Sequence, residues 1–155
     1  MEQSVKKPRT WILVADGARA RIVRFGPEGE HLEDLAFEAD HKQLKEIMAD
    51  KPGRSFASVG AKRSAVEYHS DPVRAQAEKF AELLVARLEH ARLSHEFDRL
   101  AIVAEPRMLG VIRSHMPHQL GATVIAEVHK DLTKLPAHQL HEAVLTLDIP
   151  GLFAA

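Results

Sequence analysis

The hydrophobic positions in the first third of the chain follow the pattern of short β-strands. Residues 11–15, WILVA, form a continuous apolar run that ends at an aspartate, which is typical of a buried central strand. Two further apolar runs, 22–25 and 32–37, are separated by Gly-Pro-Glu-Gly at 26–29, which indicates a hairpin. Residues 16–20, DGARA, would turn the first strand into the second. We therefore expect a three-stranded meander.

The period of the hydrophobic positions changes after residue 72. Apolar side chains then recur every three or four residues, which places them on one face of a long helix. Asp71 can cap this helix, and Pro72 suits its first turn. The positions that define the face are Val73, Ala77, Phe80, Leu84, Leu88 and Ala91.

Strand and helix patterns alternate in the rest of the chain. Residues 99–104, RLAIVA, predict a buried strand, and residues 123–128, TVIAEV, alternate as a half-buried strand does. Pro106 precedes one helical pattern, and Pro136 opens another. The apolar positions are Met108, Leu109, Ile112 and Met116 in the first helix and Leu140, Val144 and Leu147 in the second.

The expected order of elements is β-β-β-α-β-α-β-α, which belongs to the α/β class. Right-handed crossovers would add two parallel strands to the meander, giving a mixed five-stranded sheet with helices on both faces. We expect residues 1–155 to form a single domain. Residues 1–9 would be flexible, and residues 50–70 would form a long basic loop.

Composition narrows the class of protein. A chain of 155 residues with 45% hydrophobic residues can bury the core of one domain. The net charge of −1 excludes binding driven by bulk positive charge but leaves room for a local basic patch. The absence of cysteine excludes disulfides and fits a reducing compartment. The apolar run at 11–15 is too short for an export signal or a membrane span, so we expect a cytoplasmic protein without membrane contact.

The segment 51–69, KPGRSFASVGAKRSAVEYH, combines small loop residues with positive charge and has no acid before Glu67. Such a loop suits contact with an anion, because arginine matches phosphate oxygens bidentately. It equally suits a solvated loop or a contact between subunits. The candidate nucleic-acid contacts are Lys51, Gly53, Arg54, Lys62 and Arg63.

Three carboxylates follow expected strands, namely Asp16, Glu105 and Asp131. The carboxyl ends of parallel strands share one edge of a sheet, so these side chains could hold magnesium for phosphodiester hydrolysis. Acids at strand ends also cap turns and helices, and Asp16-Gly17 is itself a turn signal.

Ten histidines include two pairs at a spacing of three, His115 with His118 and His138 with His141. Two ligands do not complete a zinc site, so we expect surface histidines and neither a metal nor a cofactor.

Four stretches carry a resemblance to a known family. They are WILVADGARARIV (11–23), DKPGRSF (50–56), FDRLAIVAEPRMLGVIR (97–113) and HKDLTKLP (129–136). The chain resembles the bacterial host attachment protein family, whose members are described as required for attachment to host cells. That family is similar to the middle domain of archaeal and eukaryotic peptide-chain release factors. The resemblance implies a ribonuclease-H-like fold with the element order given above.

The release-factor domain carries a Gly-Gly-Gln loop between its third strand and first long helix, and this loop enters the ribosomal catalytic centre. The present chain has no Gly-Gly-Gln, and Pro52-Gly53-Arg54-Ser55 is its nearest equivalent, so peptide release is not expected. We expect a non-enzymatic module that binds structured RNA or the ribosome through residues 51–69 and affects attachment indirectly. The alternatives are a metal-dependent hydrolase using the strand-end carboxylates and a homo-oligomeric interaction scaffold.

Overall fold

The computed structural model describes residues 8–39, 72–147 and 149. The expected basic loop, and most of the N-terminal segment expected to be flexible, lie outside the described residues. Arg9 belongs to that segment and is held in place. Its backbone N–H and its Nε donate hydrogen bonds to Asp98 Oδ2 at 2.7 and 3.3 Å. The chain is thus fixed just before it enters the sheet.

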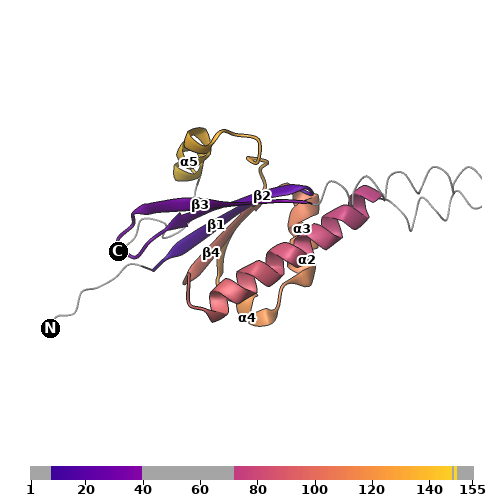
Figure 1. The fold of residues 1–155 in the computed structure, drawn as a ribbon, viewed down its shortest axis with the longest axis horizontal. Helices are drawn as coiled ribbons and strands as arrows, with labels where there is room; N and C mark the ends of the chain where they lie inside the picture. Colours follow the sequence, from indigo (N-terminus) through magenta and orange to yellow (C-terminus); the bar gives the residue numbers. More distant parts are fainter. Residues whose placement is uncertain (1–7, 40–71, 148, 150–155) are drawn as a thin grey trace, which may run out of the picture.

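Five strands form one mixed sheet in the order β3-β2-β1-β4-β5 (Figure 1). The strands are β1 (Thr10–Ala15), β2 (Arg19–Phe25), β3 (His31–Glu38), β4 (Arg99–Ala104) and β5 (Val124–Val128). The pairs β1–β2 and β2–β3 are antiparallel, whereas β1–β4 and β4–β5 are parallel. The expected meander with two added parallel strands is confirmed.

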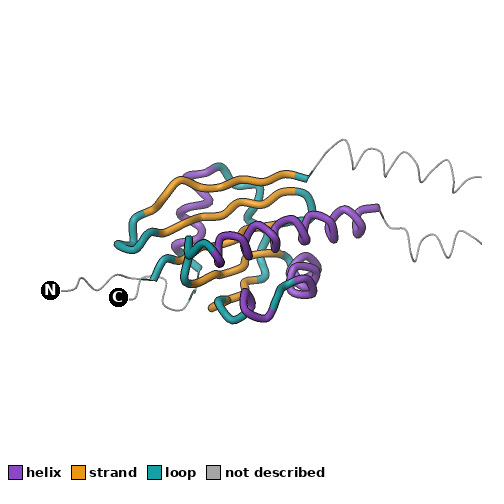
Figure 2. Tube along the Cα trace, turned by 60° about the horizontal axis from the view of Figure 1, so that its bottom comes forward, coloured by secondary structure: helices purple, strands orange, loops and turns teal. Residues whose placement is uncertain are grey.

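The described helices are α2 (Pro72–Leu93), α3 (Pro106–His115), α4 (His118–Gly121) and α5 (Ala137–Leu145). Figure 2 shows them in purple beside the orange strands. The short helix α4 was not expected from the sequence. Pro117 stands at its N-cap, and its single turn buries Leu120. One turn is too short to produce a helical period, which is why the hydrophobic pattern did not predict it.

Both faces of the sheet are covered by helices, as expected (Figure 1). Successive side chains of β1 point to opposite faces of the sheet, so this strand contributes to the hydrophobic core on both faces. Trp11, Leu13 and Ala15 lie on one face, and Ile12 and Val14 lie on the other. The first face packs against α2, α3 and α4. The second face packs against α5, which contributes the buried side chains Leu140 and Val144.

The two edge strands are irregular. In β3, Glu33 and Asp34 both fall opposite Val23, because the register passes from Ile22–Leu35 to Arg24–Leu32. In β5, Ile125 is the extra residue between the pairs Leu100–Val124 and Ala101–Ala126. Bulges and charged residues are common devices that keep a sheet edge from pairing with another chain.

Mutation of α2 can test which face of this helix is buried in the core. Leu88 on α2 is fully buried, whereas Leu83 on the same helix is 53% exposed. Replacing Leu88 by alanine should lower the free energy of unfolding by about 2–5 kcal/mol, because a buried leucine leaves a cavity. Leu83→Ala should change it by less than about 0.5 kcal/mol. Urea denaturation followed by circular dichroism measures both, and equal losses would contradict the assigned face.

Candidate functional site

Asp16 closes the turn between β1 and β2. Its Oδ1 accepts hydrogen bonds from the backbone N–H groups of Ala18 and Arg19, both at 2.8 Å. Its own backbone N–H donates to Arg19 O at 2.9 Å. An aspartate side chain that binds the backbone two and three residues ahead is a common turn former. The turn is therefore tight, and β2 begins at Arg19 rather than at the expected residue 22.

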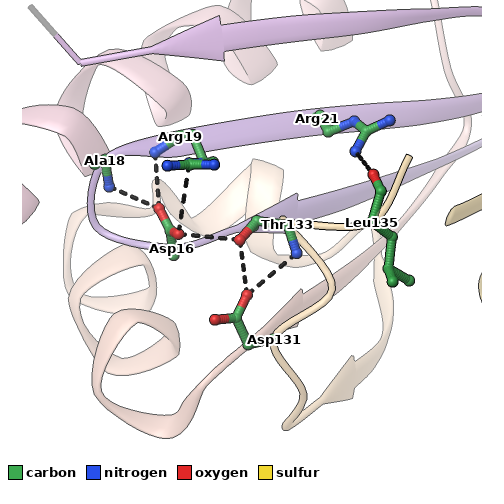
Figure 3. A network of polar contacts seen from close by, with 7 residues as sticks. All are labelled: Asp16, Ala18, Arg19, Arg21, Asp131, Thr133 and Leu135. Carbon is green, nitrogen blue, oxygen red and sulfur yellow. Dashed lines mark hydrogen bonds and ion pairs between the residues drawn. The ribbon is translucent and has the colours of Figure 1, made fainter. Parts of the chain in front are cut away.

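Thr133 joins the two strand-end aspartates (Figure 3). Its hydroxyl oxygen lies 2.7 Å from Asp131 Oδ1 and 3.0 Å from Asp16 Oδ2, and its backbone N–H donates to Asp131 Oδ1 at 3.1 Å. Only 3% of Thr133 is exposed to solvent. We call Asp16, Asp131 and Thr133 the carboxylate–threonine cluster. It ties the loop that follows β5 to the turn that follows β1.

The charges around the cluster favour the ionised form of Asp131. The hydrogen bond from the Thr133 hydroxyl lowers the pKa of this carboxyl group most strongly, and partial burial opposes it. The Thr133 backbone N–H and the positive charges of Lys134 and Arg19 lower the pKa further. Arg19 Nε also lies 4.0 Å from Asp16 Oδ2.

A second contact holds the same loop over the sheet. Arg21 on β2 donates a hydrogen bond from Nη1 to the backbone oxygen of Leu135. The loop from residue 129 to residue 136 is thus attached at two points before α5 begins. Both contacts place α5 on the second face of the sheet.

Glu105 has a different role from the other two carboxylates. It is the N-cap of α3, and its Oε1 accepts a hydrogen bond of 2.7 Å from the backbone N–H of Met108. The structure therefore brings Asp16 and Asp131 together around Thr133, while Glu105 caps a helix. Within residues 8–39, 72–147 and 149, no three histidine, cysteine, aspartate or glutamate side chains are grouped so that they could hold a metal ion.

Sequence reasoning missed Thr133 and the Arg21 contact. The contact between Asp131 and Thr133 has a sequence signal, because an aspartate two residues before a threonine can accept a hydrogen bond from the threonine backbone N–H. The contact between Thr133 and Asp16 joins residues 117 positions apart, and no periodicity or spacing in the sequence predicts it.

The paired histidines have partners elsewhere in the fold. His115 Nε2 lies 2.9 Å from Glu78 Oε1, and the His141 ring stacks on the ring of His31. Both are half-buried, so the expectation of surface histidines is wrong for these two. It fails because each lies where its helix faces another element. His118 and His138 are exposed as expected.

A hollow of about 410 Å³ lies beside the edge strand β5, where α3 ends and α4 begins. Its lining is mostly apolar, and two of the lining residues, Arg113 and Glu127, form an ion pair. The lining residues are Arg113, Met116, Pro117, His118, Gly121, Ala122, Val124 and Glu127.

Comparison with known protein families gives a match over residues 11–144 to the family described as "Protein required for attachment to host cells". The chain belongs to this family. The match runs from β1 into α5 and so includes the turn at Asp16, the N-cap at Glu105 and the loop that carries Thr133. The resemblance noted from the four sequence stretches is confirmed.

Among solved structures, a chain of the PilM-PilN type IV pilus biogenesis complex is similar, with 18% identity and a TM-score of 0.43. The similarity covers 88% of the present chain but 42% of that chain. A search of curated proteins finds no match. In the part of the chain that the structure describes, no helix has the length and apolar character needed to cross a membrane.

Thr133→Val tests the carboxylate–threonine cluster, because valine keeps the shape and removes the hydroxyl donor. We expect the free energy of unfolding near pH 7 to fall by about 1–3 kcal/mol, since the single hydroxyl donor that is lost lies between two carboxylate groups. The pKa of Asp131 should rise toward its ordinary value. A group whose pKa is lowered on folding stabilises the fold above its ordinary pKa, and this stabilisation disappears as the pH falls. The deficit of the variant should therefore shrink below about pH 4.

The matched control is Thr146→Val at the end of α5. The Thr146 hydroxyl donates to the neutral oxygen of Ala143 at 2.8 Å. This variant should lose less than about 1 kcal/mol, with no change in acid. Urea denaturation as a function of pH, with the Asp131 carboxyl titration followed by NMR, measures both variants. A Thr133→Val deficit that stays constant between pH 7 and pH 3 would contradict the assigned electrostatics.

Proposed function

We propose that this protein contributes to attachment to host cells as a non-enzymatic cytoplasmic module, and that residues 51–69 bind structured RNA on the ribosome or elsewhere. Attachment would then depend on the protein indirectly, through the synthesis of other proteins. The observation that carries the proposal is the positive charge of this segment, with four basic residues before its first acid, in a chain of the host attachment family. The relation to release factors stays a prediction.

The described residues on either side of the segment support this proposal. The backbone N–H of Ala39, after β3, donates to Ala18 O at 2.7 Å. On the other side, Ala77 in the second turn of α2 lies beside Gly17, since a Cβ built there would be 3.5 Å from the Ala77 Cβ. Described residues on both sides of the segment, Ala39 and Ala77, therefore lie against the turn between β1 and β2 that Asp16 closes. Figure 2 shows that the described chain before and after the segment ends on one side of the fold.

Exposed cations surround that end of the fold. Arg19 and Lys134 are close enough to the cluster to lower the pKa of Asp131, and Lys130 lies on the same loop. An RNA bound by residues 51–69 would also contact these basic side chains. Phosphate contacts by lysine and arginine supply most of the affinity of such modules and make binding salt-dependent.

The carboxylates support a non-enzymatic role over the hydrolase alternative. Asp16 closes a turn, Glu105 caps α3, and Asp131 is engaged by Thr133. Each negative charge thus has a structural partner in the described fold. The irregular, charged edges of the sheet likewise give little support to a scaffold formed by strand pairing between two copies.

Sedimentation of cell lysate at low and high salt tests the proposal. Wild-type protein should travel with ribosomes or RNA at low salt, and Arg54→Ala/Lys62→Ala/Arg63→Ala should remain in the supernatant. If all three side chains contact phosphate, the slope of log affinity against log salt should fall by about 2–3 in the triple variant.

The control removes three exposed charges from the described surface outside the cation group beside the carboxylate–threonine cluster, as Lys79→Ala/Arg107→Ala/Arg113→Ala. This variant should keep most of the sedimentation, and an equal loss would locate binding outside residues 51–69. Wild-type protein that stays soluble at every salt concentration would overturn RNA binding. Magnesium-dependent RNA cleavage that disappears in Asp16→Asn would instead support the hydrolase, and a concentration-dependent dimer without RNA would support the scaffold.

A further inference from the structure

Gly110 lies in the middle of α3, on the exposed side of the helix. Glycine is the least favourable residue, apart from proline, inside a helix. Neither packing nor backbone shape requires it here, because the residue has helical geometry and a Cβ built on it would meet no neighbouring element of the described chain within 4 Å. The fold itself gains nothing from the missing side chain. A second molecule, in contrast, could use it to approach the helix backbone closely.

Two arginines flank this glycine. Arg107 and Arg113 lie three residues before and three residues after Gly110, so one stands on each side of it along the exposed surface of α3. Arg107 is exposed and forms no ion pair with a described residue. Arg113 pairs with Glu127, and 59% of its side chain remains exposed. We call Arg107, Gly110 and Arg113 the arginine–glycine face. It presents positive charge around a position without a side chain.

The hollow beside β5 continues this face. Arg113 belongs to both, because it also lines the hollow together with Glu127. The volume of about 410 Å³ lies within the usual range of about 300–1,000 Å³ for ligand pockets. Most of the lining residues are apolar, and Met116 and Val124 are among them. A molecule that lies on Gly110 and extends past Arg113 would therefore reach an apolar recess.

A second copy of this chain does not suit the arginine–glycine face. Two copies related by a two-fold axis would pack α3 antiparallel to α3, with Gly110 at the crossing. Arg107 of one copy would then face Arg113 of the other, because both are three residues from Gly110. Like charges placed opposite each other oppose association. The face therefore favours a partner with negative charge.

Glu127 in the hollow distinguishes between negatively charged partners. A nucleic acid carries a phosphate at every nucleotide, so a strand that follows the face into the hollow would bring phosphate charge toward this carboxylate. A protein segment can place acids only where the arginines lie and an apolar side chain where the hollow begins. A helix presents such anchor positions at intervals of three, four and seven residues. The charges and the apolar lining thus suit an amphipathic helix.

We propose that the arginine–glycine face and the adjoining hollow bind an acidic amphipathic helix of a partner protein. The helix packs across Gly110, its acids meet Arg107 and Arg113, and one large apolar side chain enters the hollow. This surface is separate from residues 51–69 and requires no RNA. The proposal is therefore independent of the proposed function, and the triple variant at Arg54, Lys62 and Arg63 should bind the helix as the wild type does.

Peptide display on the full-length protein tests this proposal. A library of random peptides long enough for about four helical turns is selected against the wild type. Enriched peptides should carry acids and large apolar residues at helical spacing. The most enriched peptide is then synthesised with a fluorophore, and its affinity is measured by anisotropy. In Gly110→Leu the affinity should fall at least about tenfold, because the added side chain occupies the contact. The thermal midpoint of this variant should stay the same or rise, since leucine enters open space and is a better helix former.

Charge reversal gives a matched pair of variants. Arg107→Glu should weaken peptide binding by at least about tenfold, because the acids of the peptide then face a carboxylate. Lys79→Glu reverses an exposed charge on α2 instead and should change the affinity by less than about twofold. In the wild type, amide NMR shifts caused by the peptide should lie in α3, α4 and β5, a result that does not depend on any variant.

Several outcomes overturn the proposal. It is wrong if no acidic amphipathic peptide is enriched, if Gly110→Leu binds the peptide as the wild type does, or if the NMR shifts centre on another surface. A fluorescent single-stranded RNA that loses affinity in both Gly110→Leu and Arg107→Glu, in place of the peptide, would assign the face to nucleic acid. A dimer in sedimentation equilibrium that disappears in Gly110→Leu would assign it to a second copy. Either result also overturns the proposal.

Discussion

The position of β1 is the constraint on which the rest of the fold depends. This strand is hydrogen-bonded on both sides, antiparallel to β2 and parallel to β4, and all six of its residues are buried. A strand buried on both faces needs helices above and below the sheet, because neither face can be left to water. Trp11 illustrates the density of this packing, since its ring lies 5.0 Å from that of Phe97 just before β4.

The end of β1 also determines where polar groups gather. The chain must turn at Asp16, and the backbone groups freed there need partners because they lie next to the core. Asp16 supplies them through one carboxylate oxygen and uses the other toward Thr133. One side chain thus closes the first turn and anchors a loop from the far end of the sequence. This double use gives the strand-end aspartate a structural role at both ends of the chain.

The sequence predicted the elements well and their long-range contacts poorly. Residues 99–104 match β4 at both ends, and the expected face of α2 is buried from Ala77 to Ala91, whereas Val73 on the same face is 58% exposed. Such features depend on the local alternation of apolar and polar residues, which each segment carries by itself. The contact of Thr133 with Asp16 and the stacking of His141 on His31 depend on the tertiary arrangement of distant segments. Histidine pairs were therefore sought within one helix, whereas the actual pair joins a helix and a strand.

Two contacts of different kinds attach α5 to the sheet. The loop before the helix is held by Asp131, whose pKa is lowered mainly by the Thr133 hydroxyl. It is also held by the contact of Thr133 with Asp16 and by the hydrogen bond from Arg21. The helix itself is held by Leu140 and Val144, which pack against the apolar face of the sheet. A helix of nine residues is not stable alone in water, so it depends on this packing. The anchored loop keeps the helix close to the face that it covers, so docking of α5 carries little further cost in chain entropy.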